Sequence, residues 1–205
     1  MASMAAPVRL VESQTGAAAV VLSRAFQEDA GTAYMIPEMV ARSRGLPFLF
    51  APLVRYILAN GEAYTTEGTD AVALWLPPGN TTPTNEGMDQ AGIGDAAQEL
   101  GDAVMGRIMN LTSYLEIIHT QEMPEPHWRL FFLGVEPERQ RQGVGGALIQ
   151  PMLARIAEAG VSAYLDTFEE RTVPFYERQG FRVVAEGEAP DSAVHVWAMR
   201  RDPTA

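Results

Sequence analysis

The chain has 205 residues, of which 47% are hydrophobic and 20% are charged, and this balance predicts one globular domain with a core of its own. The 26 acidic residues outnumber the 15 basic ones and give a net charge of −11, so the overall field repels nucleic acids and anionic membranes. Cysteine is absent, which excludes disulfides and thiolate chemistry and fits a reducing cytoplasm. We therefore expect a cytoplasmic protein that binds neither nucleic acid nor membranes.

The N-terminal segment predicts a short strand followed by helices. Residues 8–11 have strand character, and Ser13 or Thr15 can cap a helix whose apolar positions recur up to Phe26. A second helical region covers residues 36–60, but three prolines fall within it. We therefore expect several helical pieces there instead of one rod.

The middle of the chain predicts a hairpin and then a helical insertion. The runs 62–66 and 71–76 suit two strands joined by a tight polar turn. Helical segments follow at about 96–109 and 111–118. This insertion, at about residues 80–120, is a candidate substrate lid, and a plain helical insertion is the alternative.

The last third predicts alternating strands and helices. The nearly continuous apolar run 130–135 is typical of a strand buried on both faces. Apolar residues at helical spacing then run from Leu148 to Ile156, with a kink or a wide turn expected at Pro151. The chain continues with strands at 162–167, 181–185 and 194–199 and a helix at 173–179. This order indicates an α/β fold.

Glycines between the buried strand and the next helix predict an anion site, because free backbone N–H groups and the positive end of the helix dipole meet there. A Walker loop is excluded, because no lysine lies near Gly146. A dinucleotide fingerprint starting at Gly143 is excluded, because Leu148 occupies its third small position. A third pattern, Gln/Arg-x-x-Gly-x-Gly/Ala, is matched in full by residues 140–145.

Three ordered motifs carry a resemblance to a known family: Gln140-Arg-Gln-Gly-Val-Gly145, Leu133-Gly-Val-Glu-Pro137 and Pro174-Phe-Tyr-Glu-Arg-Gln-Gly-Phe181. Together they resemble the GNAT superfamily of acyl-CoA-dependent acetyltransferases. The resemblance implies an α/β fold with a mixed, mostly antiparallel sheet flanked by helices and splayed parallel fourth and fifth strands. It also implies one acetyltransferase domain over residues 1–205, with its cofactor-binding core at about 128–181.

Weaker similarities at residues 8–26, 74–79 and 127–128 favour the branch that includes puromycin N-acetyltransferase. One departure concerns the first helix end, where a tyrosine of that branch is replaced by Ala30, and Tyr34 is out of register. A second departure is Thr172, which stands where relatives often have asparagine. The first departure predicts a different acceptor site, and the second puts one coenzyme contact in doubt.

The resemblance implies acetyl-CoA as the cofactor, with the glycine loop around its pyrophosphate and the end of the fourth strand along its pantetheine arm. The implied cofactor-binding residues are Leu133, Gly134, Val135, Arg139, Gln140, Arg141, Gln142, Gly143, Val144, Gly145, Gly146, Thr172, Phe175 and Tyr176. Within this set, the resemblance makes Tyr176 the acid that protonates the departing thiolate, and the Val135 N–H would polarise the thioester carbonyl.

Taken on their own, several of these residues leave two interpretations open. Arg139 and Arg141 place positive charge where phosphates would lie, or are ordinary solvated loop residues. Gly134 indicates a β-bulge or a close backbone approach, or is a glycine tolerated for packing. Tyr176 is either the acid or a core tyrosine whose hydroxyl bonds to the backbone.

The expected function is acetyl-CoA-dependent N-acetyl transfer, by direct attack, to a small-molecule amine. The alternatives are O-acetylation of an antibiotic or toxin, and non-catalytic acyl-CoA binding. The candidate acceptor-site residues are Glu28, Asp29, Tyr34, Trp75 and His127. No metal site is expected, because the three histidines lack metal-ligand spacing. The general base is not identified, and a monomer or a homodimer is equally compatible with the sequence.

Overall fold

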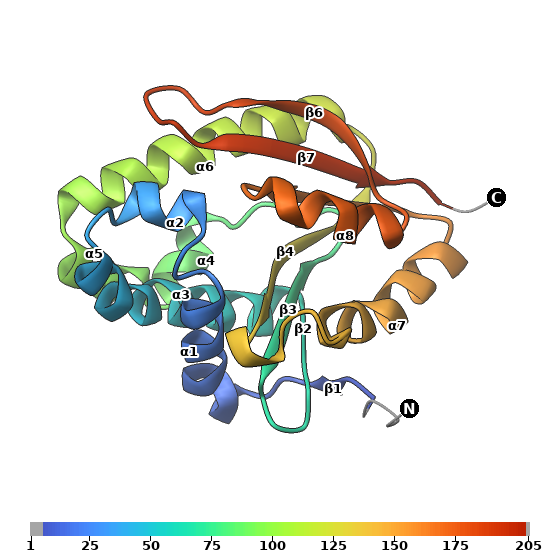
Figure 1. Ribbon diagram of the computed structural model, residues 1–205, viewed down its shortest axis with the longest axis horizontal. Coiled ribbons are helices and arrows are strands. Elements are labelled where there is room, and N and C mark those ends of the chain that lie inside the picture. The colour runs from blue at the N-terminus through green and yellow to red at the C-terminus, as the bar shows by residue number, and fades with distance from the viewer. Residues whose placement is uncertain (1–5, 204–205) are drawn as a thin grey trace.

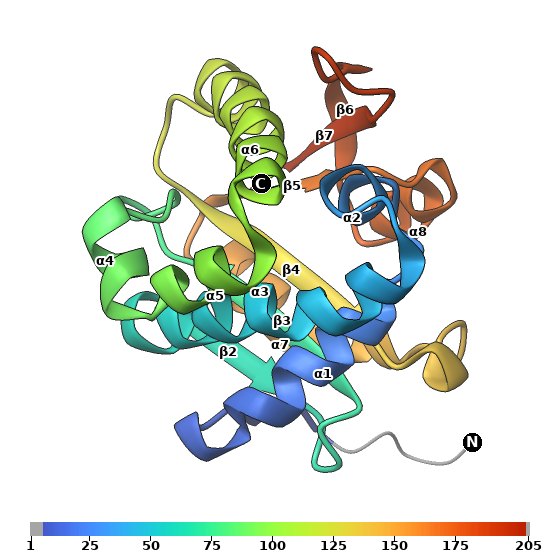
Figure 2. The ribbon, with the colours of Figure 1, turned by 90° about the vertical axis from the view of Figure 1, so that its left-hand side faces the viewer.

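A seven-stranded sheet with helices on both faces makes up the computed structural model, which describes residues 6–203 (Figures 1 and 2). The strands are β1 (Val8–Arg9), β2 (Glu62–Thr65), β3 (Ala71–Leu76), β4 (His127–Val135), β5 (Ser162–Thr167), β6 (Arg182–Glu188) and β7 (His195–Arg201). Their order across the sheet is β1-β2-β3-β4-β5-β7-β6. Neighbouring strands are antiparallel except β4 and β5, which are parallel. The predicted mixed, mostly antiparallel sheet is confirmed.

Two helical layers cover this sheet. The helices are α1 (Thr15–Ala25), α2 (Ala30–Met35), α3 (Met39–Asn60), α4 (Asn85–Gln90), α5 (Ile93–Leu100), α6 (Asp102–Glu122), α7 (Val144–Glu158) and α8 (Val173–Arg178). Short 3₁₀ turns occur at Glu12–Gln14, Pro137–Arg139 and Glu170–Thr172. Helices α1 and α3 pack on each other and on β3, whereas α7 packs on β3, β4 and β5 from the other face. Helix α6 lies beside the β6–β7 hairpin (Figure 2).

Of the three apolar clusters among the described residues, two meet at the central strand β3, and the third lies between α6 and strands β5 and β7. Leu22, Phe50 and Leu74 are at most 1% exposed in the core under α1 and α3, and Trp75 and Ile149 are fully buried in the core under α7. All six residues of β3 are buried, because apolar layers cover both of its faces. Strand β4 lies next to this buried strand on one side and forms the parallel pair with β5 on its other side.

Helix α3 corrects the prediction of separate helical pieces between residues 36 and 60. It is one helix of 22 residues with Pro47 and Pro52 inside it. Each proline removes one backbone hydrogen bond, but Leu46, Phe50 and Val54 are at most 1% exposed along the same helix. Burial of this apolar face against α1 and the sheet therefore offsets the missing bonds.

Other expectations for single elements had mixed outcomes. The predicted hairpin is confirmed, since Glu62 pairs with Trp75 and Thr65 pairs with Val72. The predicted division into segments 96–109 and 111–118 was wrong, because the break lies at Gly101, between α5 and α6, and α6 runs unbroken past residue 110 to Glu122. Helix α7 also continues unbroken through Pro151. Of the domain predicted over residues 1–205, residues 1–5 and 204–205 lie outside the described part. No helix within residues 6–203 has the length and apolar run that a bilayer crossing needs.

Candidate active site

A cleft of about 2020 Å³ opens where β4 and β5 separate. Its walls come from distant parts of the chain: the end of α1, one face of α3, the segments α4 to α6, the end of β4, the loop before α7, the end of β5, and α8. The two strands pair at only three positions, from His127–Ser162 to Arg129–Tyr164, and have no further pairs beyond them. The predicted splay of these strands therefore forms the floor of the cleft.

Hydrogen bonding to β3 sets which backbone groups of β4 face this gap. The N–H of Glu136 donates to the carbonyl oxygen of Asp70 at 2.9 Å, which orients residue 136 toward β3. Backbone groups alternate along a strand, so the N–H and C=O groups of Leu133 and Val135 point away from β3 and into the gap. Gln140 Nε2 donates to the carbonyl oxygen of Val135 at 3.0 Å, and the Val135 N–H stays available on the same edge.

Of the interpretations left open for Gly134, the structure contradicts a bulge at this residue and shows close packing against α1. Gly134 pairs regularly with Val72, and the bulge lies at Phe131, which has no partner on β3 between the pairs of its two neighbours. A Cβ at position 134 would lie 2.8 Å from Leu22 Cδ2 and 3.2 Å from Ala25 Cβ. The glycine therefore allows α1 to approach the strand closely, and no bulge is needed there.

The glycine loop ends in the positive φ of Gly143 (85°), the residue that precedes α7. The first N–H groups of a helix have no carbonyl partner within it, so those of Val144, Gly145 and Gly146 are free to meet an anion. A Cβ at Gly145 would lie 3.4 Å from Val135 Cγ2, at ordinary contact distance. The loop can thus accept a phosphate at the gap edge without backbone strain at Gly145.

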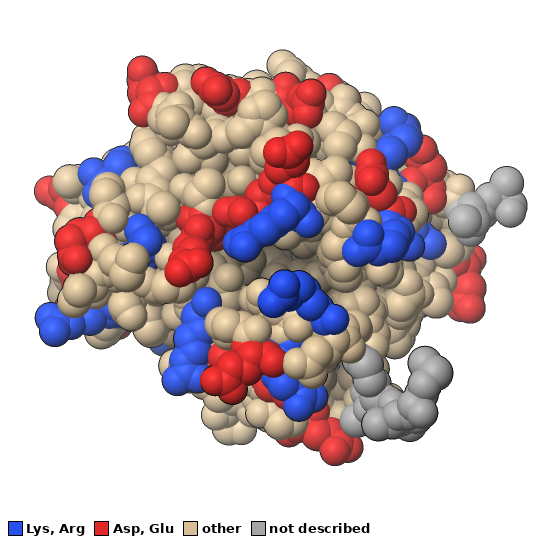
Figure 3. Space-filling model, viewed as in Figure 1, with Lys and Arg blue, Asp and Glu red and all other residues tan. Residues whose placement is uncertain are grey.

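Arginines surround the mouth of the cleft, and Figure 3 shows basic side chains on both sides of a hollow in the surface. Arg139 and Arg141 come from the glycine loop, and Arg171 and Arg178 come from the opposite wall. Two of these arginines form ion pairs: Arg139 Nε lies 3.4 Å from Asp70 Oδ2, and Arg171 Nε lies 3.0 Å from Glu169 Oε2. Gln142, in contrast, turns back to donate to the carbonyl oxygen of Glu138 at 2.7 Å and does not line the cleft.

The predicted residues after β5 come together on the wall opposite the loop. Phe175, Tyr176 and Thr172 all line the cleft. The Thr172 hydroxyl is already engaged, with Thr167 Oγ1 at 2.7 Å and the carbonyl oxygen of Glu169 at 2.7 Å. Burial, and after it the negative charge of Asp29, raises the pKa of Tyr176 above its ordinary value. Tyr176 therefore keeps its proton at neutral pH.

Of the five candidate acceptor-site residues, Asp29 alone is among the residues that line the cleft. Glu28 is exposed outside it. The Tyr34 hydroxyl accepts a hydrogen bond from Asn110 at 3.0 Å, away from the cleft. Trp75 is fully buried in the core under α7, and its indole N–H has no partner among residues 6–203. His127 is buried in a polar network below the cleft floor.

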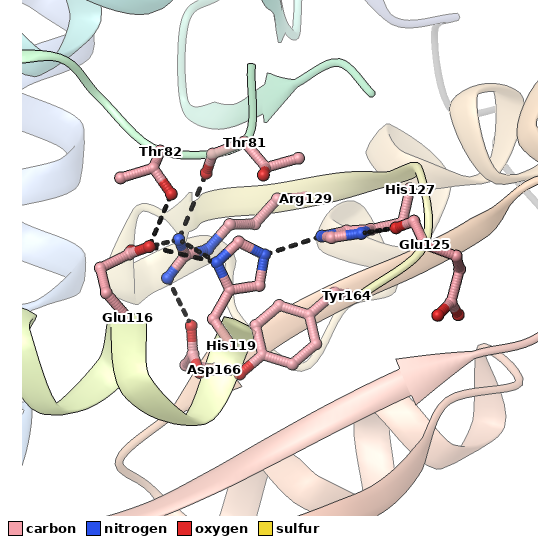
Figure 4. Close-up of polar contacts among 9 residues, drawn as sticks. All are labelled: Thr81, Thr82, Glu116, His119, Glu125, His127, Arg129, Tyr164 and Asp166. Carbon is pink, nitrogen blue, oxygen red and sulfur yellow. Dashed lines mark hydrogen bonds and ion pairs between the residues drawn. The ribbon is translucent and has the colours of Figure 1, made fainter. Parts of the chain in front are cut away.

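Arg129 is the centre of that network (Figure 4). It lies at the last position at which β4 pairs with β5. Its guanidinium donates to Glu116 of α6, to Asp166 of β5 at 2.9 Å, and to the carbonyl oxygen of Thr81 at 3.2 Å. Burial alone would lower the pKa of Arg129, but the charges of Asp166 and Glu116 outweigh it and raise the pKa. These ion pairs tie α6, β4 and β5 together where the strands part.

Two imidazoles extend the network away from the cleft (Figure 4). His127 Nδ1 lies 2.7 Å from the carbonyl oxygen of Glu125, so this nitrogen carries a hydrogen. Burial lowers the pKa of His127, which leaves its Nε2 free to accept. His119 Nε2, 2.7 Å away, therefore donates to it, and His119 Nδ1 faces Glu116 Oε2 at 3.2 Å. In residues 6–203, no three histidine or acidic side chains gather as metal ligands.

Sequence reasoning missed most of this network. Its only local signals are a charged residue within an apolar strand, at Arg129, and polar side chains at alternate positions near the end of β5, at Tyr164 and Asp166. On α6, Glu116 and His119 lie three residues apart and so share a face. None of these signals indicates that the three elements meet.

The comparisons with known proteins agree with this geometry. Residues 93–181 match the family model described as Acetyltransferase (GNAT) family. Mycothiol acetyltransferase of Propionibacterium freudenreichii subsp. shermanii is 40% identical over 63 residues, which are 29% of this chain and 20% of that protein. The uncharacterized N-acetyltransferase YjcF of Bacillus subtilis is 28% identical over 80 residues, which are 39% of this chain and 57% of that protein. The matched segments thus cover less than two thirds of either relative.

Solved structures share the fold over nearly the whole chain. A histone acetyltransferase HPA2 and related acetyltransferase from Corynebacterium glutamicum superposes with a TM-score of 0.71 at 20% identity and covers 98% of this chain and 97% of its own. Drosophila melanogaster polyamine N acetyltransferase superposes with a TM-score of 0.60 at 16% identity, covering 96% and 98%. At such identities, the likeness shows the fold alone.

The fold is that of the GNAT acetyltransferases: a mixed sheet with a splayed parallel pair and a glycine loop at its edge. The family match over residues 93–181 and the structural neighbours together support the GNAT acetyltransferase superfamily. The branch that includes puromycin N-acetyltransferase is not confirmed by these comparisons.

Proposed function

We propose that the protein is an acetyl-CoA-dependent N-acetyltransferase that transfers the acetyl group directly to a small-molecule amine. The observation that carries the proposal is one continuous cleft, which joins the free amides at the start of α7, the open edge of β4 and the half-buried Tyr176 side chain. The chain would act as one acetyltransferase domain, and the segment α4 to α6 would cover one side of the cleft.

The residues at the basic end of the cleft fit coenzyme A. The amides of Val144, Gly145 and Gly146 would hold the pyrophosphate, and the arginines at the mouth would neutralise its charge. The edge groups of Leu133 and Val135 would pair with the amides of the pantetheine arm, as a neighbouring strand does. The same Val135 N–H would polarise the thioester carbonyl when the acetyl group lies in the gap.

Tyr176 would supply the proton that the leaving thiolate needs. Acetyl-CoA supplies the activated acetyl group when it is bound, and the protein's own part is to orient the reactants and move protons. A phenol is protonated at neutral pH, and Tyr176 lines the cleft, so it would be available as a proton donor in each turnover. The structural neighbours support an amine acceptor, since one of them is a polyamine N acetyltransferase that forms N acetylagmatine.

The test is a mass-spectrometric screen of amines with acetyl-CoA, run together with release of free coenzyme A thiol. Each amine is paired with the alcohol of the same skeleton. All 15 basic residues of the chain are arginines, so acetylation of lysine side chains cannot contribute a background. Acetylated amine with stoichiometric thiol supports the proposal. Transfer to hydroxyl groups only, or coenzyme binding without turnover on any acceptor, contradicts it.

A further inference from the structure

Asp29 has an arrangement that a plain helix cap does not need. Its Oδ1 accepts from the N–H groups of Gly31 at 2.9 Å and Thr32 at 3.2 Å and so caps α2. Its Oδ2 makes no hydrogen bond within residues 6–203, although the side chain lines the cleft and the residue is only 8% exposed. With Oδ1 occupied by the two amides, Oδ2 is the carboxylate oxygen that is left to accept from a group in the cleft.

The surroundings of Asp29 are charged on several elements. Burial raises its pKa to about 6; the capping bond from Thr32 opposes this rise, and the charge of Glu169 adds to it. Arg171, from the turn before α8, lowers the pKa by a smaller amount. On α8, Tyr176 faces Asp29 closely enough for the carboxylate charge to raise the phenol pKa. The pKa values of Asp29 and Tyr176 are thus well separated, as those of a base and an acid of one reaction are.

The wall next to Asp29 is aromatic. Phe26, at the end of α1, packs edge-on against Phe132 with ring centroids 5.5 Å apart, and Phe132 packs against Phe131 at 5.0 Å. All three rings line the cleft. Two consecutive phenylalanines share this face because the strand is bulged at Phe131. An acceptor whose nitrogen reached Asp29 would therefore place the rest of its skeleton on apolar rings.

Building on the proposed acetyltransferase function, we propose that Asp29 binds and deprotonates the acceptor, and that this acceptor is a primary amine with an apolar or aromatic body packed on Phe26, Phe131 and Phe132. The ammonium gives its first proton to Asp29 Oδ2, which later releases it to the solvent in the cleft. The nitrogen forms the new C–N bond as the C–S bond breaks. Tyr176 gives its proton to the sulfur, and the second nitrogen proton restores the phenol.

The experiment measures binding of 2-phenylethylamine by calorimetry in the presence of coenzyme A, where no transfer can occur. Wild-type affinity should fall about tenfold from pH 7.5 to pH 5, because the carboxylate becomes protonated through its pKa of about 6 while the amine stays charged. Asp29→Asn keeps a capping side chain and should lower the affinity at pH 7.5 by about ten- to a hundredfold and remove the pH dependence. Ethylamine should bind about ten- to a hundredfold more weakly than 2-phenylethylamine.

Glu38→Gln is the matched control. Glu38 caps α3 through the amides of Val40 and Ala41, as Asp29 caps α2, but it is exposed and lies outside the cleft lining. The Glu38→Gln variant should bind the amine with unchanged affinity. A second control is 2-phenylethanol, which should bind equally well to wild type and to Asp29→Asn. Unchanged amine affinity and pH profile in Asp29→Asn would overturn the role of Asp29, and equal binding of ethylamine and 2-phenylethylamine would overturn the apolar body. If these binding results hold while acetyl-CoA gives no product, the amine site is supported and the acetyltransferase function is overturned.

Discussion

At the scale of single residues, Tyr176 holds its proton because burial and the nearby Asp29 charge both oppose ionisation. Tyr176→Phe removes only the hydroxyl, so we expect acetyl transfer to slow by about a hundred- to a thousandfold, within the usual range for acid catalysis. Steady-state rates with acetyl-CoA and a saturating amine measure this effect.

Two further measurements separate an acid from a core tyrosine. Coenzyme A affinity, measured by calorimetry, should change little in Tyr176→Phe. The rate defect should shrink as pH rises, because a thiolate departs more easily without protonation at high pH. A loss of the same size at every pH would make Tyr176 a structural residue.

Gly145 offers a test of the loop that leaves the fold in place. A Cβ there makes only ordinary contacts, the nearest being 3.4 Å from Val135 Cγ2, so Gly145→Glu should fold normally. Its carboxylate would enter the proposed pyrophosphate site, and acetyl-CoA binding should become undetectable by calorimetry. Gly16→Glu is the matched control, because Gly16 is also the second residue of its helix and has no neighbour within 4 Å of a Cβ. Normal binding by Gly145→Glu would refute the loop assignment.

The sequence predicted the place of a residue well where its neighbours in the chain form a recognisable pattern, and poorly where its contacts come from distant segments. Val144 to Gly146 follow a recognisable loop pattern, and the structure brings them to the cleft with Tyr176. Trp75, by contrast, lies in a run that is buried on both faces of the sheet. No local pattern distinguishes a residue at a strand end that faces a cleft from one that faces a core.

At the scale of elements, the Arg129 network joins α6, β4 and β5. Burial alone would raise the pKa of Glu116, but the hydrogen bond from His119 and the charge of Arg129 outweigh it and hold the pKa at about 2. A carboxyl whose pKa is lower in the folded state stabilises the fold above its unfolded pKa of about 4.5, and this contribution is lost as pH falls toward 2.

Glu116→Gln should therefore lower the free energy of unfolding at pH 7 by about 1–3 kcal/mol. The difference from wild type should diminish between pH 4.5 and pH 2, as urea titrations at several pH values would measure. Glu99→Gln, on the exposed surface of α5, should match wild type throughout. A deficit that stays constant down to pH 2 would show that the carboxylate charge is not what matters.

Elements with a strong local period were predicted well, and those decided by tertiary packing were not. The hairpin 62–76 and strand β4 follow from alternation and from an apolar run. The predicted burial of that run on both faces was wrong, because residues 131–133 are only partly buried and line the cleft. Helix α3 was not predicted as one helix, because its two prolines locally favour an interruption. Contacts with α1 and the sheet keep the helix continuous through both prolines. Packing against distant segments cannot be read from a window of residues.

At the scale of the whole molecule, the net charge of −11 contrasts with the arginines at the mouth of the cleft. Arg141, in the glycine loop, should attract coenzyme phosphates over a distance that salt shortens. Arg141→Gln should weaken coenzyme A binding about three- to tenfold at about 10 mM salt, and the difference should nearly vanish at about 500 mM. Arg182→Gln, whose partner is Asp202 on the distant β6–β7 hairpin, should behave as wild type in the same calorimetric series. Equal effects of both substitutions would mean that overall charge, and not the local cluster, governs the affinity.

The bulge at Phe131 reverses which alternate residues of β4 direct their backbone groups toward β3 and which direct them toward the gap. β4 carries one residue more than β3 between two paired positions, so odd and even residues exchange roles at that point. Without it, the backbone groups of residues 132 and 134 would face the gap, and the amides of Leu133 and Val135 would be used by β3. A deletion or insertion of one residue between Leu130 and Leu133 would thus alter the coenzyme edge and the aromatic wall together, whereas substitutions at the same positions would alter only one of them. The length of this short segment is therefore more strictly constrained than its composition.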